Sequence, residues 1–533
     1  MRRFSSYGPI DRDEHYYAPR NELIEQAYTQ LVGDNPQKGG HYITVWAPRQ
    51  TGKSWVLLQA LEQIEKNQDL NVDVVKVDLD LPEHDTNPDS IAAAIAEDIF
   101  TQLGKKNPGI DTFKQFPELF TGDVLEKPLI LIIDEFDALP KEAISRLTRI
   151  FRNIYMRRQK ELRKPQKEKR YRLHGLALIG IRTVLGIENK RGSPFNVQRS
   201  LHIPNLTKDE VKGMFQWYEK ESGQTVDEQA IDRLFYETNG QPGLTCWFGE
   251  LLTEKYNKEK EDPITIENFK YVYKEATHVL PNNNILNIIS KIKPEPYRQQ
   301  VLDLFKTGEK TEFRFDDEEL NYLYMNGVID IEREMNQKDE PEVYCKFSNP
   351  FVQGRLFNYF SRKMFDDLGL LIHPLDEMED AVSEDSLNIP NIIIRYKAYL
   401  KKNREAVFKG MPRRKRDMRV YEAVYHFNLY RYLYDLLKKR GVDVIPEFPT
   451  GNGKIDLILK YREQVYALEL KSFRDMYDYR RGIEQAADYG KQLGLKEIVL
   501  LVFVELKEEE VKELEQEIGK PGIKVIVIPI GVL

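Results

Sequence analysis

The stretch Tyr466–Lys471 reads Tyr-Ala-Leu-Glu-Leu-Lys, and its alternating character is typical of a β-strand. Every second residue of a strand faces the same way, so Glu469 and Lys471 share one face with Ala467. The two leucines share the opposite face. The strand therefore presents an acidic and a basic side chain side by side on one surface.

A second strand-like run, Ile455–Lys460, precedes this stretch and carries an acid at Asp456. A short turn between the two runs would fold them into an antiparallel hairpin. Pairing Lys460 with Val465 then places Asp456 opposite Glu469, with Cβ atoms about 4.5–5.5 Å apart. Two carboxylates at that separation suit one hard divalent cation, which prefers oxygen ligands. The pattern predicts a metal site on this hairpin.

These residues resemble the signature of the PD-(D/E)xK nuclease superfamily, with Asp456, Glu469 and Lys471 as its D…ExK. The resemblance implies that the two acids hold one or two Mg²⁺ or Mn²⁺ ions and that the lysine positions the attacking water. The alternative interpretation is a solvated charged face on a structural hairpin. The apolar character of Val465–Leu470 disfavours that alternative, because an exposed hairpin would be more polar.

Flanking segments extend this resemblance over Met418–Leu533. Arg419–Leu437 reads as a helix, and its Glu422 matches an acid that many members carry upstream of the hairpin. Gln485 and Tyr489 match the Q-x-x-x-Y element of the RecB-like branch, and their spacing puts them on one helix face. The resemblance implies that Glu422 belongs to the catalytic site and that Gln485 orients the substrate or the lysine.

A second motif lies near the N-terminus, where the strand-like run Ile43–Trp46 leads into the loop Ala47–Ser54 and then into a helical pattern. This is the P-loop arrangement, in which backbone N–H groups at a helix N-terminus surround phosphates. Lys53 would reach the β- and γ-phosphates, and the Ser54 hydroxyl would hold Mg²⁺. The residues expected to bind the nucleotide here are Arg49, Gln50, Thr51, Gly52, Lys53 and Ser54.

A partner motif supports the P-loop assignment. Pro128–Ile133 is a continuous apolar run, as expected for a buried parallel strand, and it ends in Asp134 and Glu135. This is a Walker B pattern, in which Asp134 would bind Mg²⁺ and Glu135 would polarise the attacking water. Both motifs follow strands in the order expected for a P-loop ATPase.

Further segments resemble bacterial AAA-like ATPases related to the STAND class and to archaeal ATPases. They include Tyr16–Arg20 before the P-loop and Asn239–Leu244, whose Pro242 matches a G-x-P element of the helical lid. The resemblance covers Tyr16–Tyr256. It implies that Arg182, after a fourth apolar strand, senses the γ-phosphate, that Pro242 lies at the nucleotide, and that nucleotide controls homo-oligomerisation.

Composition sets further bounds on the 533-residue chain. Hydrophobic residues make up 41% and charged residues 31%, an ordinary balance for a protein with a large core. Net charge is −7, so nucleic-acid contact must come from local patches. The two cysteines, Cys246 and Cys345, cannot form a disulfide framework. With no membrane-spanning run and no secretory signal pattern, the sequence predicts a cytoplasmic protein with no membrane partner.

The sequence predicts a multidomain α/β protein built around a parallel-sheet ATPase. The expected segments are a leader at 1–40, a P-loop core at 41–205, a helical lid at 206–290, a winged-helix-like domain at 291–362, a linker and connector helix at 363–417, and the nuclease domain at 418–533. The expected ATPase strands are Tyr42–Trp46, Val72–Val77, Leu129–Ile133, Leu176–Ile181 and Ser200–Ile203.

The winged-helix pattern spans Pro296–Phe360, and its second helix, Asp317–Met325, begins with acids. Acids repel phosphate, so a packing or regulatory role is expected there rather than DNA reading. Two basic clusters are candidates for nucleic-acid contact, although such blocks are also typical of solvated loops. The first consists of Arg157, Arg158, Lys160, Arg163, Lys164, Lys167, Lys169, Arg170 and Arg172, and the second of Lys409, Arg413, Arg414, Lys415, Arg416 and Arg419.

Together the motifs predict an ATP-dependent or ATP-regulated, Mg²⁺-dependent nuclease that binds ATP and cleaves nucleic acid, with DNA as the expected substrate. The STAND-like resemblance points to prokaryotic defence or mobile-element biology, by analogy alone. One alternative is a nucleotide-switched scaffold whose nuclease-like domain only binds DNA or protein. Another is a DNA-translocating motor whose nuclease trims what the ATPase moves.

Overall fold

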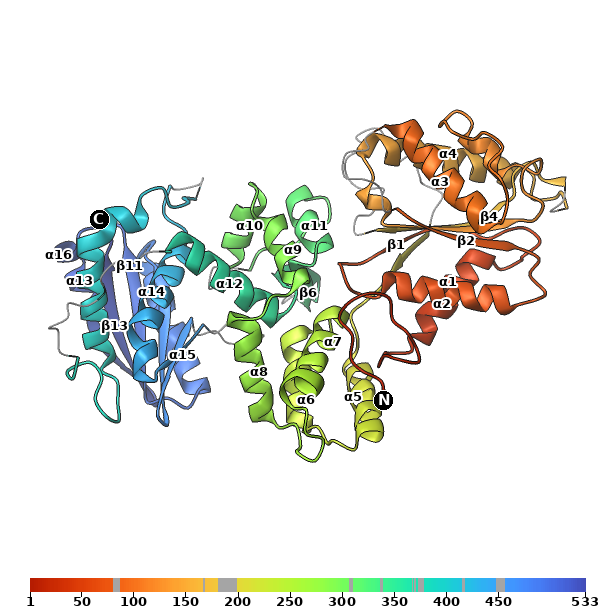
Figure 1. Cartoon of the computed structure of the whole chain (residues 1–533). Coiled ribbons are helices and arrows are strands. Elements are labelled where there is room, and N and C mark those ends of the chain that lie inside the picture. The colour runs from red at the N-terminus through yellow and green to blue at the C-terminus, as the bar shows by residue number, and fades with distance from the viewer. Residues whose placement is uncertain are drawn as a thin grey trace. The chain divides into compact units, whose positions relative to one another are not determined.

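The computed structural model of the chain describes residues 1–79, 87–165, 168–180, 199–305, 310–335, 339–366, 368, 371, 378–414, 418–446 and 456–533. Arg182 and three members of the basic clusters, Lys167, Lys415 and Arg416, lie outside these described residues. The chain divides into two compact units, one of 1–284 with 314–329 and one of 285–313 with 330–533. Each unit is described by itself (Figure 1).

The first unit is built on a five-stranded sheet in the order β2-β3-β4-β1-β5, and every neighbouring pair is parallel. The strands are β1 (Tyr42–Trp46), β2 (Asp73–Asp78), β3 (Leu129–Asp134), β4 (Leu173–Gly180) and β5 (Arg199–His202). All six residues of β3 are buried, which explains its unbroken apolar sequence. The predicted parallel sheet and its five strands are confirmed.

Helices cover both faces of this sheet (Figure 1). On one face, α1 (Asn21–Val32) and α2 (Lys53–Lys66) form a hydrophobic core with Ile43 and Val45 of β1. On the other face, α3 (Pro88–Gln102) and α4 (Lys141–Lys160) form a second core. Alternate residues of β3 divide between the two cores, because successive strand side chains point to opposite faces. This arrangement positions the P-loop at the carboxyl end of β1.

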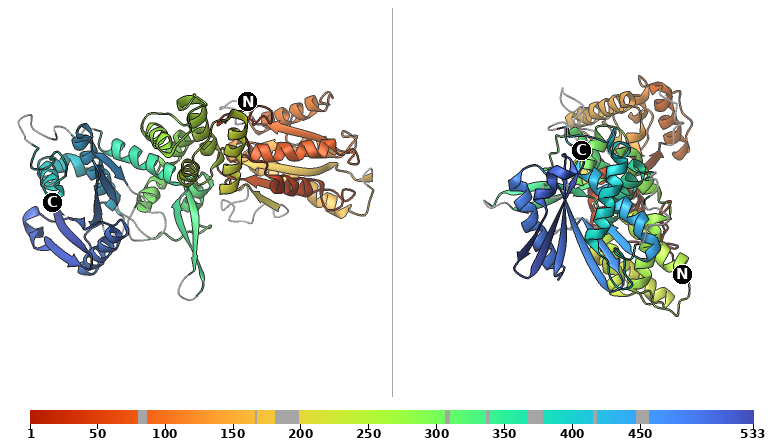
Figure 2. Two further views of the ribbon diagram at one scale, coloured as in Figure 1. Left: turned by 90° about the horizontal axis from the view of Figure 1, so that it is seen from below. Right: turned by 90° about the vertical axis from the view of Figure 1, so that its left-hand side faces the viewer.

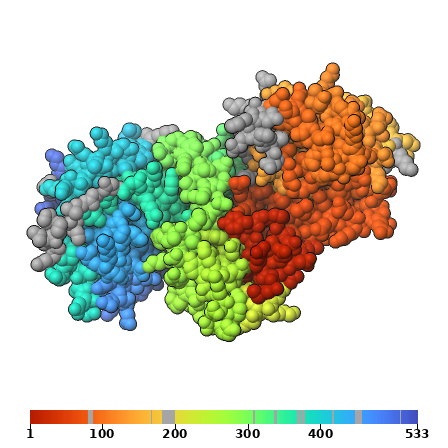
Figure 3. Space-filling model, viewed as in Figure 1, coloured from red at the N-terminus to blue at the C-terminus, as the bar shows by residue number. Residues whose placement is uncertain are grey.

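A helical lid follows the sheet. Its helices are α5 (Lys208–Ser222), α6 (Glu228–Thr238), α7 (Pro242–Glu250) with a π-helical turn at Leu251–Tyr256, and α8 (Ile266–His278). The leader packs on these helices, as Figure 3 shows in dark red against yellow-green. The Phe4 ring lies 4.8 Å from that of Phe215, and Arg2 Nη1 lies 2.6 Å from Glu221 Oε1. The first residues of the chain are thus held on the lid helices by an aromatic contact and an ion pair.

Several helices and a two-stranded sheet follow the lid along the chain, over the range of the predicted winged helix. They are α9 (Asn283–Ile292), α10 (Tyr297–Leu304), α11 (Glu318–Met325), β6 (Ile329–Met335), β7 (Pro341–Phe347) and α12 (Pro350–Met364). Figure 2 shows β6 and β7 as a long two-stranded hairpin. However, α11 belongs to the first compact unit and α10, β7 and α12 to the second. The winged-helix module therefore stays a prediction.

The second unit contains a mixed six-stranded sheet in the order β12-β13-β11-β10-β9-β8. Its strands are β8 (Asp443–Pro446), β9 (Leu457–Tyr461), β10 (Gln464–Ser472), β11 (Glu497–Val504), β12 (Gln516–Lys520) and β13 (Ile523–Gly531). The β10–β11 and β11–β13 pairs are parallel and the others are antiparallel. Helix α15 (Met476–Gln492) packs on one face. On the other face, Phe503 of β11 contacts α13 (Ile389–Phe408) through Tyr396 and α14 (Glu422–Leu437) through Tyr425.

The linker before this sheet contains the segment Pro374–Ile389, which the sequence predicts as a flexible tether. Within its described part, the Tyr461 hydroxyl donates to the carbonyl of Ser383 at 3.0 Å, and the Leu387 N–H donates to the Tyr466 hydroxyl at 2.8 Å. The predicted connector helix, Ile392–Leu400, is also longer and forms α13. These segments bond to β9, β10 and α14, so residues 378–388 are held against the sheet, and the flexibility of the linker stays a prediction.

Short helical turns complete the described structure at Phe116–Phe120, Phe136–Ala138, Lys438–Arg440, Glu508–Val511 (α16) and Lys512–Leu514. No helix in the described parts of the chain is both long and apolar enough to cross a bilayer.

Candidate active sites

The first site lies at the loop between β1 and α2. Gly52 has a φ of 89°, a left-handed conformation that suits glycine, and it forms the N-cap of α2. Lys53 Nζ donates to the carbonyls of Ala47 at 3.1 Å and Pro48 at 2.9 Å. Burial lowers the pKa of Lys53 to about 8, although the carboxylates of Asp137 and Asp134 act in the opposite direction. The loop thus folds around its own lysine at a helix N-terminus.

Asp134 ends β3 beside this loop. Its Oδ2 accepts a hydrogen bond from Ser54 Oγ at 2.5 Å and lies 3.5 Å from Lys76 Nζ on the neighbouring strand β2. The structure therefore brings together the hydroxyl and the carboxylate that the sequence predicted as Mg²⁺ ligands. An oxygen pair of this kind fits a hard divalent cation.

Glu135 follows Asp134 in a left-handed conformation with φ of 52°, which is uncommon for a residue with a side chain. Its N–H donates to Asp134 Oδ1 at 2.9 Å, and its own side chain is exposed. Such backbone strain concentrates at functional sites. Glu135 is therefore held at the edge of the loop, where it is open to solvent and to ligand.

Asp137 is a residue of this site that the sequence reasoning missed. A Cβ added to Gly180, at the end of β4, would lie 2.6 Å from Asp137 Oδ1, so the carboxylate packs directly over that strand end. Among the charges near Lys53, Asp137 has the largest effect on its pKa. The motif Asp134-Glu135-Phe136-Asp137 places a second acid three residues after Asp134, and this spacing was the signal that could have indicated Asp137.

The lid reaches the P-loop through the N-terminus of α7. Gln241 Nε2 donates to the carbonyl of Arg49 at 2.9 Å, and Gly243 N–H donates to the carbonyl of Gln50 at 3.0 Å. Pro242 is the first residue of α7 between these contacts. The lid proline predicted to lie at the nucleotide is thus positioned beside the loop that would hold it.

The second site lies on the β9–β10 hairpin. Val465 pairs with Lys460 and Leu468 with Leu457, so the predicted register is confirmed. Asp456, just before β9, is 2% exposed and Glu469 of β10 is 0% exposed. Burial raises the pKa of Asp456 well above its usual range, and the neighbouring Glu469 carboxylate adds to the effect.

Lys471 lies on the same face of β10, with its Nζ 3.1 Å from Glu469 Oε1. Burial opposes its charge, but the carboxylates of Glu469, Glu422 and Asp456 outweigh burial and raise the pKa of Lys471. The lysine is therefore a permanent cation at neutral pH. Its positive charge compensates part of the negative charge of the neighbouring carboxylates.

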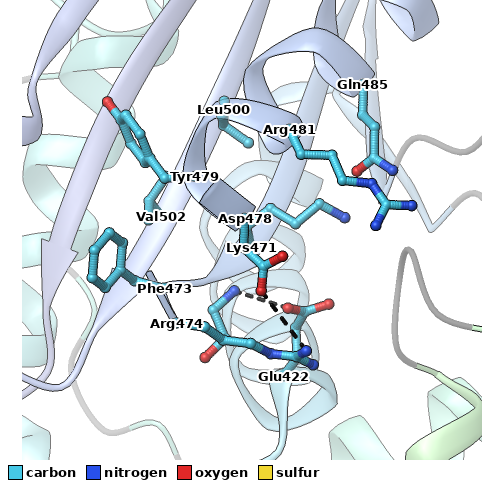
Figure 4. Close-up of a pocket in the computed structure, with 11 residues that line it drawn as sticks. Glu422, Lys471, Phe473, Arg474, Asp478, Tyr479, Arg481, Gln485, Leu500 and Val502 are labelled. Carbon is cyan, nitrogen blue, oxygen red and sulfur yellow. Dashed lines mark hydrogen bonds and ion pairs between the residues drawn. The ribbon is translucent and has the colours of Figure 1, made fainter. Parts of the chain in front are cut away.

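A small cleft, with about 60 Å³ open to water, lies over this face (Figure 4). Its lining includes Glu422, Lys471, Arg481 and Gln485. Glu422 begins α14, and its Oε2 accepts the Ser472 N–H at 2.8 Å, as the dashed line in Figure 4 marks. The structure thus gathers the hairpin, the upstream acid and the α15 glutamine around one cleft.

A metal ion at this site would have to be held by a pair of acids. Within the described part of the chain, no group of three or more His, Cys, Asp or Glu side chains is placed to hold a metal ion. Asp456 and Glu469 nevertheless fit a divalent cation, because they are two buried carboxylates whose close approach raises the pKa of Asp456. Backbone carbonyls and water would have to supply the remaining ligands.

His426 is a second residue that the sequence reasoning missed. Its Nε2 lies 2.9 Å from the backbone oxygen of Asp456, and its Nδ1 lies 3.9 Å from Asp456 Oδ1. Burial lowers the pKa of His426 to about 4, so the ring is neutral at pH 7. Its place four residues after Glu422, on the same face of α14, was the available signal.

The two basic clusters are partly structural. Arg158 and Lys169 are only 5% and 2% exposed. Arg158 donates to the carbonyl of His174 at 2.8 Å, and Lys169 donates to the carbonyl of Gln37 at 3.0 Å. In the second cluster, Arg419 donates to the carbonyl of Phe473 at 2.7 Å. These three side chains hold backbone carbonyls, and nucleic-acid contact by the two clusters stays a prediction.

Comparisons with known proteins agree with the first site. Residues 37–163 match the family described as AAA domain, so the chain carries an AAA-type P-loop ATPase domain. Such a domain binds nucleotide, usually with Mg²⁺. No curated protein matches the chain significantly.

Solved structures that resemble the chain are remote in sequence. The Walker-type ATPase of Pyrococcus abyssi is 14% identical with a TM-score of 0.40, over 66% of this chain and 99% of that chain. The Orc1 protein of Aeropyrum pernix, solved in complex with DNA, is 16% identical with a TM-score of 0.34, over 64% and 92%. The RuvB Holliday junction branch migration motor of Thermotoga maritima is 14% identical with a TM-score of 0.34, over 60% and 92%.

Proposed function

We propose that the chain is an ATP-regulated, metal-dependent nuclease. The observation that carries the proposal is the buried pair Asp456 and Glu469, in register across a hairpin, with Lys471 Nζ 3.1 Å from Glu469. Burying two carboxylates together is costly unless their charge is compensated. The two acids do not line the cleft themselves, but Lys471 lines it and contacts Glu469, so the pair lies next to a space suited to a cation and an anionic substrate.

The residues of this cleft have distinct roles in the proposal. A divalent cation held by Asp456 and Glu469 would lower the pKa of a bound water and neutralise phosphate charge. The Lys471 ammonium stabilises negative charge that develops on the phosphate and orients the attacking water. Gln485, on the opposite wall, orients the phosphodiester. Glu422 holds Ser472, the residue after Lys471, and so fixes the end of the strand.

The ATPase site has a parallel set of roles. Backbone N–H groups of Arg49–Gly52 and the Lys53 ammonium receive the phosphates, after the lysine leaves the carbonyls of Ala47 and Pro48. Ser54 and Asp134 hold Mg²⁺, and Glu135 polarises the attacking water. Because α7 contacts the P-loop, binding or release of nucleotide at the loop would shift the lid.

Two further parts of the proposal concern partners. The substrate is nucleic acid, with DNA as the first candidate, and the nucleotide state controls self-association of the chain. Arg182, predicted as a γ-phosphate sensor, remains part of this proposal. A role in prokaryotic defence or mobile-element biology follows only from the STAND-like resemblance.

One observation favours a rival function, a nucleotide-switched scaffold that binds without cutting. Within the described residues the acids form a pair and not a group of three or more. Incubation of the full chain with plasmid, linear and single-stranded substrates, with and without Mg²⁺ and ATP, separates the two functions. Asp488→Ala is the control for Asp456→Ala, because Asp488 is an exposed acid of α15 and lies on neither strand of the hairpin. Absence of divalent-dependent cutting under every condition would favour the scaffold.

A further inference from the structure

Three residues of α15 form a stripe on one side of the helix. Tyr477, Arg481 and Gln485 are spaced four residues apart, so each lies about 6 Å along the axis from the next and on nearly the same side. Arg481 and Gln485 line the cleft beside Lys471, and in Figure 4 the side chains of Lys471, Arg481 and Gln485 extend toward the same side. The stripe therefore runs from the first turn of α15 to the proposed catalytic lysine.

The outer end of the stripe is an exposed aromatic ring. Tyr477 is 74% exposed, and its neighbour Met476 is 47% exposed. Asp475 Oδ1 accepts the Tyr477 N–H at 2.8 Å and fixes the first turn of the helix that carries the ring. A large ring held in solvent on the first turn of the helix that lines the cleft is suited to stacking on a flat partner.

The middle of the stripe is a cation available to a ligand. The acids nearest to Arg481 on α15 pair elsewhere: Asp478 Oδ2 lies 3.8 Å from Arg474 Nη1, and Glu484 Oε1 lies 2.5 Å from Lys520 Nζ. Arg481 is exposed and forms no ion pair within the described part of the chain. Its guanidinium can therefore bind a phosphate by donating two parallel hydrogen bonds.

The inner end of the stripe approaches the buried acids. Tyr489, four residues beyond Gln485, is half-buried, and its pKa is raised by burial and then by the charge of Glu469. Aromatic ring, guanidinium, amide and acid pair thus follow one another from solvent to the interior. This order matches a single nucleic-acid strand whose outer base stacks on the aromatic ring while its phosphodiester enters the cleft.

We propose that α15 is a binding track for single-stranded nucleic acid, in which Tyr477 stacks on an unpaired base and Arg481 holds the next phosphate. The proposal deepens the proposed nuclease function and rests on it for the position of the scissile bond. A base in a duplex has both faces covered by its neighbours, so only an unpaired base can stack on a tyrosine ring. The substrate class is therefore a single strand or a frayed end rather than an intact duplex.

The test is binding of the full chain to fluorescent oligothymidylate, oligouridylate and a duplex hairpin of equal length, in EDTA so that no cleavage occurs. Tyr477→Ala should weaken binding of single strands by about 5- to 150-fold and leave the hairpin unchanged, whereas Tyr477→Phe should bind like wild type. Arg481→Ala should reduce the slope of log Kobs against log salt by about 0.7 on single strands. A preference between the two oligonucleotides identifies DNA or RNA.

Matched controls use the same residue types, one on α15 and one on the lid. Arg480→Ala removes an exposed arginine next to Arg481 that does not line the cleft, and Tyr271→Ala removes a 58%-exposed tyrosine of the lid. Both should bind like wild type. Wild-type affinity of Tyr477→Ala for single strands, or an equal loss for the hairpin, overturns the proposal. Because binding is measured without metal, this failure is distinguishable from failure of the nuclease itself, which appears only as absent cleavage.

Discussion

The Oδ2 atom of Asp456 accepts the backbone N–H of Leu470 at 2.6 Å across the β9–β10 hairpin. This bond continues the strand pairing one step beyond Leu457 and Leu468. It holds the Asp456 carboxylate beside Glu469, with both groups buried. A backbone N–H therefore fixes the position of one acid of the pair.

The first prediction separates the two kinds of residue on the hairpin. Asp456→Ala and Glu469→Ala should remove cleavage and weaken Mn²⁺ binding, because each leaves a single acid for a hard cation. Lys471→Ala should lower cleavage by about 10²–10³-fold but keep near-normal Mn²⁺ binding, because the ammonium is not a ligand. Calorimetric Mn²⁺ titration and a plasmid-cutting assay measure the two effects.

ATP hydrolysis should persist in all three hairpin variants, which provides the control for folding of the chain. Glu422→Ala should have a milder effect, since its carboxylate holds the Ser472 N–H. Wild-type cutting by all four variants would make the hairpin structural and favour the scaffold function.

Much of the site could be predicted from the sequence, because strand period and hairpin register are local properties. Alternation placed Glu469 and Lys471 on one face, and pairing of Lys460 with Val465 followed from the short turn. The apolar run ending at Asp134 likewise predicted a buried parallel strand. Local pattern was sufficient wherever the contact lay within one supersecondary unit.

Long-range contacts were not predictable in the same way. Arg158 and Lys169 read as surface cations, but they hold backbone carbonyls of segments far away in the sequence. His426 meets Asp456 only because α14 packs on the sheet. The tether over 378–388 read as acidic coil, yet it bonds to Tyr461 and Tyr466. In each case the partner is set by tertiary packing, which periodicity does not encode.

A second prediction concerns the stability cost of the acid pair. The folded-state pKa of Asp456 is raised, so its ionisation at neutral pH opposes folding, and stability is lost as pH rises through that pKa. Asp456→Asn should raise the free energy of unfolding of the metal-free protein by roughly 0.5–2 kcal/mol. Chemical denaturation in EDTA measures it. Added Mn²⁺ should stabilise the wild type and not the variant; a destabilised Asp456→Asn would contradict the strain argument.

The third prediction concerns the nucleotide site. Lys53→Ala should weaken ATP binding and abolish hydrolysis, because it removes the cation at the phosphates. Glu135→Gln should keep binding and lower hydrolysis by at least about 10²-fold, because only water polarisation is lost. Phosphate release and fluorescent-nucleotide binding measure the two steps. Full turnover in Glu135→Gln would show that another residue polarises the water.

A fourth prediction concerns acid stability of the ATPase core. Burial lowers the pKa of His174 from 6.5 to about 4, with Arg158 adding to the effect. The unfolded state binds the extra proton first, so stability is complete above pH 6.5 and falls as pH drops toward 4, by up to about 3 kcal/mol. Burial also lowers the pKa of His41, which therefore contributes in the same direction. His174→Gln should flatten the pH dependence of the free energy of unfolding between pH 7 and pH 4. An unchanged slope would show that groups other than His174 cause the loss of stability in acid.

The last prediction concerns the contact between the lid and the P-loop. A Cβ on Gly243 would lie 2.5 Å from Gln50 Oε1 and 2.6 Å from Gln50 Cβ, and the Gly243 N–H already donates to the Gln50 carbonyl at 3.0 Å. Gly243→Ala should therefore displace the start of α7 from the loop and lower ATP hydrolysis, although alanine favours the helix itself. Gly213→Ala is the matched control, because Gly213 lies within α5 with nothing near its added Cβ. It should retain hydrolysis and gain up to about 1 kcal/mol of stability. Steady-state ATP hydrolysis and thermal unfolding of the two variants measure these effects. Equal hydrolysis in both variants would show that α7 can move from the P-loop without changing turnover.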